Sequence, residues 1–594
     1  MSEVLVKYFS PDSIKLAYNR VFCWSDKLVK DNVGLRAFGY NLDSNAEILS
    51  QKIISGGYKP ERGFKFYTPK ASYTNRTKTT LNVEDAIIYQ AIVDKIGSTC
   101  FDMFNDLETV VFGSVLSPDV KKGTAILKEA DPNFFFFKFW KNLFNDFKDS
   151  VIHSIEEDKA KFKFETDITG FFDCIPHYNL LEKLSTRFGV EDEILNLLSN
   201  CLNIWSGTKD SMTPGVGIPQ GPAPSFFLAN LVLHELDELI IDQGLKYYRY
   251  MDDIKIYGFD ENKLIESLVL IDKHLKGNGL SINAKKTKIE RIDADKEDAT
   301  VKELKKIAAF GIYDNDENTI SSIDFDYLID QLDQQKFEPK KDKPKKIKVD
   351  KELKQVYKLS NQSQEVENDF ELQPKNTLTD PIEIKQFWEK CIVEIEKELP
   401  EFFKDPESEI LELKEDIDDI DFIRTSAHYS NSVRALQNIN EKPFYPNEHL
   451  IKYWLFAYDK FFWRSNCFGL TLNLYPNNAE IKTEILRLIN GKFKLYEWSS
   501  YFAFQTLSFS FNFSDQELRQ EYLGFLQSET SDLVKISIYR LLIKHSKNEQ
   551  FNVVIKRQLQ KEKNKYLKIL VTDFYKNGAN KDVNMVEFLN SISL

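Results

Sequence analysis

Two adjacent carboxylates interrupt a pair of strand-like runs, and this feature restricts the folds open to the chain more than any other. The stretch "YYRYMDDIKIYG" (247–258) alternates aromatic or branched residues with polar ones, as a half-buried strand pair does. Asp252 and Asp253 lie between its two halves. A water-exposed hairpin tip would tolerate them, but the favoured two-residue turns contain Asn-Gly or Asp-Gly, and "MDD" has no glycine.

Neighbouring half-buried carboxylates repel each other, and one of them takes up a proton unless a cation is present. Mg²⁺ prefers oxygen ligands and often binds one or two carboxylates together with substrate phosphates. The pair therefore predicts a metal site that acts on a phosphate group. A two-metal site needs a further carboxylate. Asp167 supplies a candidate, because it follows the strand-like run "KFKFETDI" upstream.

Composition sets the class of protein. The chain has 594 residues, 42% hydrophobic and 29% charged, which is globular and long enough for more than one core. The net charge of −13 argues against non-specific coating of nucleic acid, although a basic channel could lie inside an acidic shell. The scattered cysteines form no CxxC metal knuckle, which favours reduced thiols and a cytoplasmic location. No apolar stretch is long enough for a membrane span, and the N-terminus lacks the features of a secretion signal.

Local patterns divide the chain into three parts. Residues 1–335 mix helical and strand patterns, including strand-like "KIAAFGIYD" near the end. Residues 336–380 are rich in lysine and then polar, which predicts a mobile linker or insertion; a basic tether for nucleic acid and a solvated loop are both open. Residues 381–594 read as helices. From Trp463, a helix–turn–helix pattern recurs at intervals of about 35 residues, which predicts stacked helical repeats.

Four ordered motifs extend the interpretation of the aspartates. These are "DITGFFDCIP" from Asp167, "GIPQGPAPSFFLANLVLHELD" from Gly217, "RYMDDIKIYG" from Arg249 and "GLSINAKKTK" from Gly279. They resemble motifs A to D of a reverse transcriptase palm, and "AAFGIY" (308–313) is similar to motif E. Upstream, "YKPERGFKFYTPKASYTNR" and "VEDAIIYQAIV" resemble the fingers.

The resemblance covers roughly residues 50–315 and implies a right-hand polymerase. We expect α+β fingers and palm, followed by an all-α helical-repeat domain that replaces or extends the thumb. The implied reaction is attack of a 3′-hydroxyl on the α-phosphate of a deoxynucleotide, assisted by two Mg²⁺ ions, with Mn²⁺ as a substitute. Asp167 and Asp252 would bridge the metals, and Asp253 would be a third, weaker carboxylate. Asp173 matches a structural position.

The resemblance also assigns residues that bind the deoxynucleotide, namely Lys70, Arg76, Phe172, Gln220 and Gly221. The two cations would hold the triphosphate. The Phe172 ring matches the steric-gate position and would exclude a ribose 2′-hydroxyl. The alternative interpretation, a core aromatic residue, fits Phe171 better than Phe172. The motif B pair would lie against the templating base pair. Lys286 matches the motif D lysine, a candidate acid for the pyrophosphate, although a surface lysine is an equal alternative.

Among reverse transcriptases, the chain resembles the bacterial abortive-infection and defence-associated enzymes of the "unknown group". The expected signatures of maturase, HNH, retron and RNase H relatives are missing. The resemblance implies antiphage defence and a homo-oligomer. Some members make DNA without a template from a protein hydroxyl, and others copy a partner non-coding RNA; nothing in the sequence decides between them. Candidate priming residues, each also explained by packing, are Tyr522, Tyr539, Tyr566 and Tyr575.

Two other functions compete with the polymerase. Arg540 and His545 have the Arg-x4-His spacing of HEPN ribonucleases, although the stretch also suits a repeat helix, and Arg424 to His428 is one residue short. Alternatively, the palm could be a vestigial nucleic-acid-binding platform. The intact set of Asp167, Asp252 and Asp253 speaks against that reading, because binding alone needs no converging carboxylates.

Overall fold

The computed structural model describes residues 2–24, 29–128, 134–293, 298–310, 381–439 and 444–577. These residues form two compact units. The first contains the described residues up to 310 and those from 557 onward, and the second contains residues 381–556. An α+β part therefore precedes an all-α part, as the sequence predicts.

The N-terminal half of the first unit is a helical layer with one β-hairpin. Its helices are α1 (Glu3–Phe9), α2 (Pro11–Cys23), α3 (Asn32–Gly39), α4 (Leu42–Ile54), α5 (Val83–Asn105), α6 (Asp119–Lys122) and η2 (Gly123–Lys128). Ser10 caps α2 by accepting a hydrogen bond from the Ser13 amide. Strands β1 (Phe64–Pro69) and β2 (Asn75–Thr80) pair antiparallel, with Phe66 opposite Lys78.

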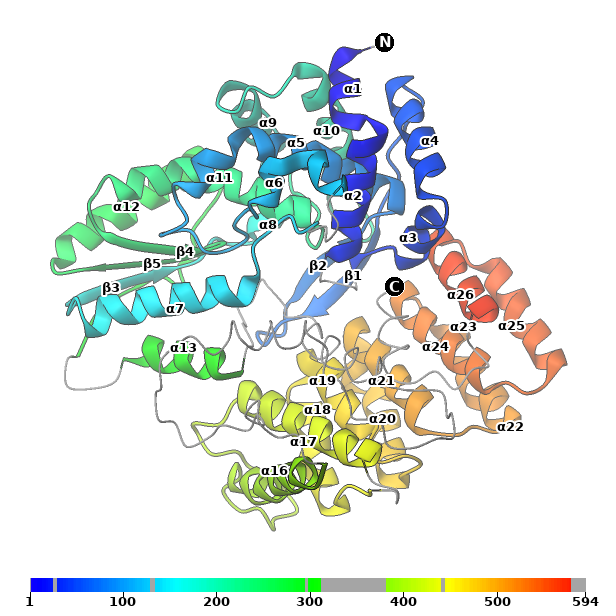
Figure 1. Ribbon diagram of the computed structural model, residues 1–594. Coiled ribbons are helices and arrows are strands. Elements are labelled where there is room, and N and C mark those ends of the chain that lie inside the picture. Colours follow the sequence, from blue (N-terminus) through cyan, green and yellow to red (C-terminus); the bar gives the residue numbers. More distant parts are fainter. Residues whose placement is uncertain are drawn as a thin grey trace. The chain divides into compact units, whose positions relative to one another are not determined.

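A four-stranded antiparallel sheet forms the palm. Its order is β4 (Lys246–Tyr250), β5 (Asp253–Gly258), β3 (Phe162–Thr166) and β6 (Lys288–Arg291). Phe164 in β3 is fully buried and lies opposite Ile256 on one side and Ile289 on the other. In Figure 1, α12 (Glu261–Gly277) lies on one face of this sheet and α7 (Trp140–Glu156) on the other.

Further described helices belong to the palm region. They are α8 (Phe171–Cys174), α9 (His177–Thr186), α10 (Asp192–Trp205), α11 (Ala223–Ile241) and α13 (Ala299–Phe310). Fifteen of the 19 residues of α11 are buried, so this helix is apolar nearly all round and forms the centre of the unit. It contacts α5, α9, α12 and β4, and therefore joins the fingers to the palm.

The chain returns to the first unit at Arg557, and its last described helix there is α26 (Lys565–Asn577). The Tyr566 ring lies 4.8 Å from that of Phe64 in β1, and Asp573 forms a 2.7 Å ion pair with Arg36 in α3. These contacts place the end of the described chain with the fingers. The predicted domain of residues 381–594 differs from the structure in this respect, because its last helix packs outside the helical unit.

The second unit consists of packed helices. They are α16 (Pro381–Glu401), α17 (Asp419–Ile439), η3 (Glu448–Leu450), α18 (Ile451–Lys460), η4 (Phe462–Arg464), α19 (Ser465–Leu472), α20 (Ala479–Asn490), η5 (Lys492–Leu495), α21 (Glu497–Ser510), α22 (Asp515–Glu517), η6 (Leu518–Tyr522), α23 (Leu523–Ser528), α24 (Asp532–His545) and α25 (Glu549–Lys561), whose end belongs to the first unit. The predicted helix–turn–helix units are present: α19 with α20, α21 with α22–α23, and α24 with α25. Helix α21 packs between α19 and α24.

Three sequence expectations have other outcomes. The strand expected around "KIAAF" is wrong, because these residues lie in helix α13. The remainder of the motif E candidate and the expected linker at 336–380 lie outside the described residues. Within the part of the chain that the structure describes, none of the helices combines the length and apolarity that a membrane span requires.

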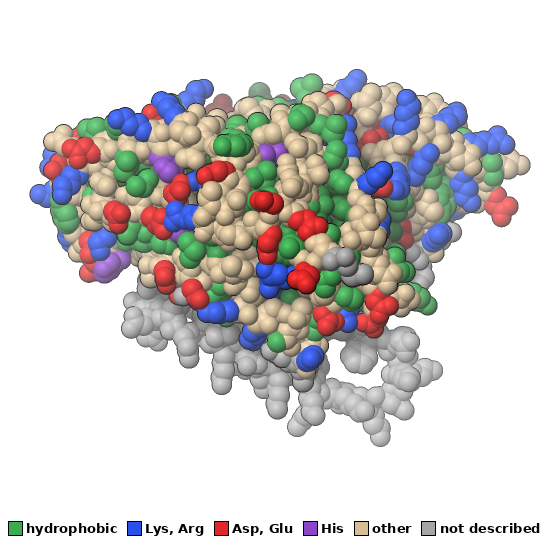
Figure 2. All heavy atoms as spheres, turned by 90° about the horizontal axis from the view of Figure 1, so that it is seen from above, with side chains coloured by type: hydrophobic (Ala, Val, Ile, Leu, Met, Phe, Trp, Pro, Cys, Tyr) green, Lys and Arg blue, Asp and Glu red, His purple; other side chains and the backbone are tan. Residues whose placement is uncertain are grey.

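The surface carries charges of both signs. Figure 2 shows lysine and arginine side chains interspersed with aspartate and glutamate on one face of the structure. Such a mixture gives no extended basic field on this face, in keeping with the net charge of −13.

We predict that the second unit loses stability as the pH falls from about 6.5 to about 4. Burial lowers the pKa of both His428 and His545 to about 4, and the His545 ring bonds to the Ser508 carbonyl at 2.8 Å. The unfolded chain, with histidine pKa values near 6.5, binds protons first, so each histidine costs up to about 3 kcal/mol on acidification.

Thermal unfolding at several pH values measures this loss. His545→Gln should weaken the pH dependence, whereas the exposed His449, changed to Gln, should leave it unchanged. An equal pH dependence in wild type and His545→Gln would contradict the assignment.

Candidate active site

The β4–β5 hairpin carries the aspartate pair on a strained turn. Tyr250 lies opposite Asp253, so Met251 and Asp252 alone make the turn, and Met251 adopts a φ of 55°. The expectation that "MDD" disfavours a tight turn is therefore wrong, since methionine takes the conformation usually left to glycine or asparagine. The tip is also buried, with Met251 1% and Asp252 2% exposed. A strained residue of this kind persists only where its surroundings fix it.

A buried arginine fixes the turn. The Arg249 guanidinium donates to the Met251 carbonyl at 2.6 Å and to the Asn230 side-chain oxygen at 2.8 Å. It also forms a two-bond ion pair with Asp237, at 2.7 Å and 2.6 Å. The side chains of Arg249 and Asp237 are each 1% exposed. Burial alone would lower the Arg249 pKa, but the Asp237 carboxylate raises it, so the pair stays charged.

The loop before the palm closes around the same turn. The Asn230 amide donates to the Gly113 carbonyl at 2.8 Å, and the Phe112 amide donates to the Arg249 carbonyl at 2.9 Å. A Cβ atom on Gly113 would lie 2.5 Å from the Met251 nitrogen, so only glycine permits this approach. Helix α11, strand β4 and this loop thus hold the tip from three sides.

Asp167 lies at the end of the neighbouring strand. Thr166 pairs with Ile254, and Asp167 comes directly after it, so the two strand ends bring Asp167 beside the Asp252–Asp253 turn. Lys286 Nζ lies 2.9 Å from Asp167 Oδ2, and the Asn283 amide donates to the Asp167 carbonyl at 2.8 Å. The structure therefore brings motifs A, C and D together, as the resemblance implies.

The second aspartate of the pair has a different environment. Lys255 Nζ lies 3.7 Å from Asp253 Oδ2 and 3.3 Å from Glu165 Oε1. Burial alone would lower the Lys255 pKa, but these two carboxylates raise it, so the ammonium stays charged. Sequence reasoning missed this lysine, although a cation alternating with Asp253 along a strand is a visible signal.

Two of the three predicted aspartates have carboxylate oxygens that fit a divalent cation. One buried oxygen of Asp167 and one of Asp252 have no hydrogen-bond partner among the described residues. Hard carboxylate oxygens of this kind are the ligands that Mg²⁺ and Mn²⁺ prefer. The predicted set of three is not assembled, because no three histidine, cysteine or acidic side chains of the described chain converge closely enough to hold an ion. Asp167 and Asp252 would hold the metal.

The motif B residues connect the palm to the fingers. The Thr79 amide in β2 donates to the Gln220 carbonyl at 3.0 Å, and the Trp24 indole donates to the Gly221 carbonyl at 3.1 Å. Gly221 adopts a φ of 133°, and a Cβ atom there would lie 2.5 Å from Val29. Gln220 thus contacts the hairpin that carries the predicted triphosphate cations, whereas Gly221 contacts residues that follow α2.

Those cations lie near a carboxylate that sequence reasoning treated as structural. Arg76 is opposite Thr68 in the β1–β2 hairpin, and Lys70 follows β1 at the turn. Loss of solvation raises the pKa of Asp173, while the positive charges of Lys70 and Arg76 act against this shift. Asp173 therefore shares an electrostatic site with both predicted triphosphate ligands.

Phe172 is buried. It is 2% exposed, compared with 1% for Phe171, so burial does not separate the predicted steric gate from its neighbour. The Phe172 ring lies 5.2 Å from that of Phe226 in α11, and its carbonyl accepts from the Ile218 amide at 2.8 Å. The ring is thereby fixed beside the motif B loop.

The candidate sites elsewhere are packed into cores. Arg540 is 9% exposed, and the His545 ring faces Phe513 at 5.1 Å. Tyr522 and Tyr539 are fully buried. Burial of these groups supports their interpretation as packing residues over that as a ribonuclease pair or primers.

Comparison with known families identifies the site. Residues 111–336 match the model of the family "Reverse transcriptase (RNA-dependent DNA polymerase)". The chain contains a reverse transcriptase domain. The match includes Asp167, Asp252 and Lys286, whereas the fingers residues Lys70 and Arg76 precede it. The α+β palm with this domain and the helical C-terminal region confirms the predicted fold class.

Individual relatives resemble parts of the chain. An "Uncharacterized 91 kDa protein in cob intron" of Schizosaccharomyces pombe is 39% identical over 77 residues, which is 13% of this chain and 9% of that protein. Telomerase from Candida albicans, solved with a TWJ fragment of telomeric RNA, is 11% identical with a TM-score of 0.30, over 73% of this chain and 66% of that one. The Candida tropicalis counterpart is 11% identical with a TM-score of 0.26, over 77% and 68%. These scores are too low to assign a fold, so the assignment depends on the matched domain.

We predict that Arg249→Met lowers the free energy of unfolding of the first unit by about 3–5 kcal/mol, because Asp237 becomes a buried charge without its partner. The double variant Arg249→Met, Asp237→Leu should recover most of the loss, since apolar residues often replace a buried ion pair at little cost. Thermal and denaturant unfolding measure both variants.

The control is Arg187→Met, which removes a partly exposed partner of Glu235 and Glu238. It should cost no more than about 1 kcal/mol. A double variant as unstable as Arg249→Met would show that the ion pair does not determine the stability of the turn.

Proposed function

We propose that this protein is a reverse transcriptase that synthesises DNA from deoxynucleotides with divalent metal ions, two Mg²⁺ or, as a substitute, Mn²⁺. The observation that carries the proposal is the pair of buried carboxylate oxygens on Asp167 and Asp252 that lack hydrogen-bond partners within the described chain. They lie where two strand ends of the matched domain meet. Two metal ions there would activate the 3′-hydroxyl and neutralise the leaving pyrophosphate.

The protein's own groups supply the remaining requirements. Lys70 and Arg76 on the fingers hairpin would bind the triphosphate, because that ligand needs cationic donors. Asp173 lies near both and would keep them oriented through charge. Lys286 contacts Asp167, a proposed metal ligand. It would therefore lie close enough to the leaving pyrophosphate to donate a proton to it. Gln220 and Gly221 would contact the templating pair, and Asp253, near Lys255, would act through charge.

The biological role is a proposal from the sequence resemblance. We propose a cytoplasmic, homo-oligomeric enzyme of antiphage defence, of the abortive-infection type, which makes DNA without a template from a protein hydroxyl. The alternative is copying of a partner non-coding RNA. The local likeness to the intron protein of Schizosaccharomyces pombe favours another possibility, that this chain is related to proteins found in introns. The chain spans 9% of that relative's length, so the likeness supports a shared domain and leaves the role to experiment.

Two non-polymerase functions have less support. A nucleic-acid-binding platform would give no reason to keep two unpartnered carboxylate oxygens buried at one turn, since each costs free energy on burial. A ribonuclease at Arg540 and His545 would need an accessible imidazole that can both gain and lose a proton during the reaction. Burial lowers the His545 pKa to about 4, which holds the ring neutral.

We predict that Asp252→Asn and Asp167→Asn each reduce nucleotide incorporation by at least about 10³-fold, because each removes a charged metal ligand. Asp253→Asn should reduce it less. The assay supplies Mg²⁺ with one labelled deoxynucleotide at a time, first without template or primer and then with primed RNA, followed by protease digestion.

Label that shifts after protease would indicate protein-primed synthesis, and synthesis only on primed RNA would indicate a templated enzyme. Asp272→Asn, on the distant helix α12, is the matched control and should retain activity. Equal incorporation by wild type and Asp252→Asn would contradict the polymerase.

We predict that Phe172→Val increases ribonucleotide incorporation relative to deoxynucleotide incorporation, because a smaller side chain leaves room for the 2′-hydroxyl. The ratio of kcat/KM values for the two sugars measures the effect. Phe171→Val removes an equally buried ring and should lower stability without changing that ratio. A ratio altered only by Phe171→Val would assign the gate to the other ring.

A further inference from the structure

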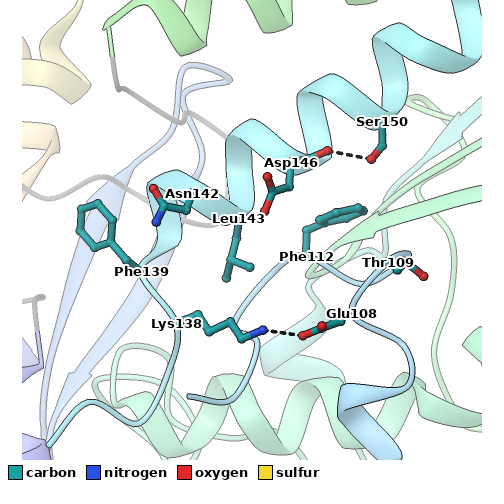
Figure 3. A pocket seen from close by; sticks show the side chains of 9 residues that line it. All are labelled: Glu108, Thr109, Phe112, Lys138, Phe139, Asn142, Leu143, Asp146 and Ser150. Atoms are coloured by element: carbon teal, nitrogen blue, oxygen red, sulfur yellow. Dashed lines mark hydrogen bonds and ion pairs between the residues drawn. The ribbon is translucent and has the colours of Figure 1, made fainter. Parts of the chain in front are cut away.

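A cavity of about 550 Å³ lies beside the palm and belongs to the first unit. Its walls come from the loop after α5 and from the start of α7, and the lining residues are Glu108, Thr109, Phe112, Lys138, Phe139, Asn142, Leu143, Asp146 and Ser150. The volume is in the usual range of ligand pockets. Figure 3 shows Leu143 and Asp146 projecting from α7 toward the space above the Lys138–Glu108 ion pair, with Phe112 beside it.

The lining combines apolar surfaces with hydrogen-bond acceptors. Phe112, Phe139 and Leu143 supply the apolar part, and Phe139 is 58% exposed although its ring is large. Glu108 is engaged by Lys138, whereas no described residue donates a hydrogen bond to the Asp146 carboxylate. Asp146 is exposed, and partial loss of solvation and the nearby charge of Asp149 raise its pKa, while the charge of Lys138 acts against this shift.

These groups define the chemistry of the ligand. Two carboxylates exclude a phosphate group from the interior, and the polar atoms disfavour a purely apolar chain. A flat ring with N–H donors on its edge satisfies both parts of the lining. Adenine, cytosine and guanine each carry an exocyclic amine that can donate to a carboxylate, as cytosine does to aspartate, whereas uracil carries none. Aromatic side chains also stack on unpaired bases in single-strand binding sites.

The rim supplies partners for a nucleic-acid backbone. Lys141 follows Phe139 by two residues and its Nζ lies 5.6 Å from the Trp140 ring, whereas Lys138 is already paired with Glu108. Phe135, also exposed, adds a second aromatic surface on this segment. Cations interleaved with exposed aromatic rings are typical of single-stranded nucleic-acid binding.

The pocket is joined to the catalytic hairpin through the backbone. The Arg249 amide donates to the Val110 carbonyl at 2.8 Å, and the Phe112 amide donates to the Arg249 carbonyl at 2.9 Å. The segment around Val111, which forms one wall of the pocket, therefore pairs with Arg249 in β4, the strand that leads into Asp252. A strand seated in the pocket would lie along the palm.

We propose that this pocket binds one unstacked, amine-bearing base of single-stranded nucleic acid, with the base stacked on Phe139 and its amine donating to Asp146. The proposal rests on the proposed function in one respect: the strand would be the template or product of the polymerase.

The test is equilibrium binding of fluorescent RNA oligomers of about 12 nucleotides, without deoxynucleotides, at fixed ionic strength. Wild type should bind oligo(A) and oligo(C) more tightly than oligo(U). Phe139→Ala should weaken oligo(A) binding by about 5- to 150-fold, the range for loss of one stacked base. Phe259→Ala removes a ring that is 61% exposed elsewhere in the unit and should have no effect.

The carboxylate gives the sharper comparison, because charge and hydrogen bonding predict opposite signs. Removing a negative charge should tighten binding of any nucleic acid, and we expect this small effect from Asp149→Leu on the same helix. Asp146→Leu, which removes both acceptor oxygens as well as the charge, should instead weaken binding of oligo(A) and oligo(C) and abolish the preference over oligo(U). Thermal unfolding of each variant confirms that it is folded.

Equal tightening of all oligomers by Asp146→Leu and Asp149→Leu would overturn the proposal, as would unchanged binding in Phe139→Ala. The assay contains no synthesis step, so failure of the polymerase and failure of the pocket are separate results. A protein that lacks incorporation but shows the Asp146 effect keeps the base site and loses the proposed enzyme.

Discussion

The ion pair between Arg249 and Asp237 is the interaction on which the arrangement of the site depends. It is almost completely buried and joins the central helix α11 to strand β4. Through the same guanidinium it binds the carbonyl of Met251, the residue with the left-handed backbone in the turn. A buried pair of this kind adds little net stability over an apolar pair of equal volume. Its contribution here is geometric, because it holds a turn that local preference disfavours.

Cations inside the protein compensate for the acidic palm. Lys255 lies between Asp253 and Glu165, Lys286 contacts Asp167, and Lys163 contacts Asp298. Each carboxylate is thereby matched locally, which allows a chain with a net charge of −13 to gather acidic groups at one sheet edge. One oxygen of Asp167 contacts Lys286, but its other oxygen and one oxygen of Asp252 have no hydrogen-bond partner among the described residues, and these two atoms mark the position where chemistry is expected.

Local sequence predicted the elements and the aspartates, because each motif is continuous along the chain and its period matches its structure. It failed where distant residues decide. The short apolar run near Ala308 suits either a strand or a helix, and the helix was realised. Arg249 within a strand and Asp237 on an apolar helix were visible as buried charges, but their pairing requires the fold. The same holds for Tyr566, whose partner Phe64 is some 500 residues away.

The return of the chain to the fingers has a consequence for biosynthesis. The contacts of Tyr566 with Phe64 and of Asp573 with Arg36 close only after the intervening helical unit has been translated. At ordinary elongation rates of about 5–20 residues per second, the fingers therefore wait on the order of half a minute or longer for their last helix. During this interval the surface of β1 that Tyr566 later covers is open to other partners, including chaperones. A ribosome-bound chain thus exposes an unfinished fingers domain until α26 has been synthesised.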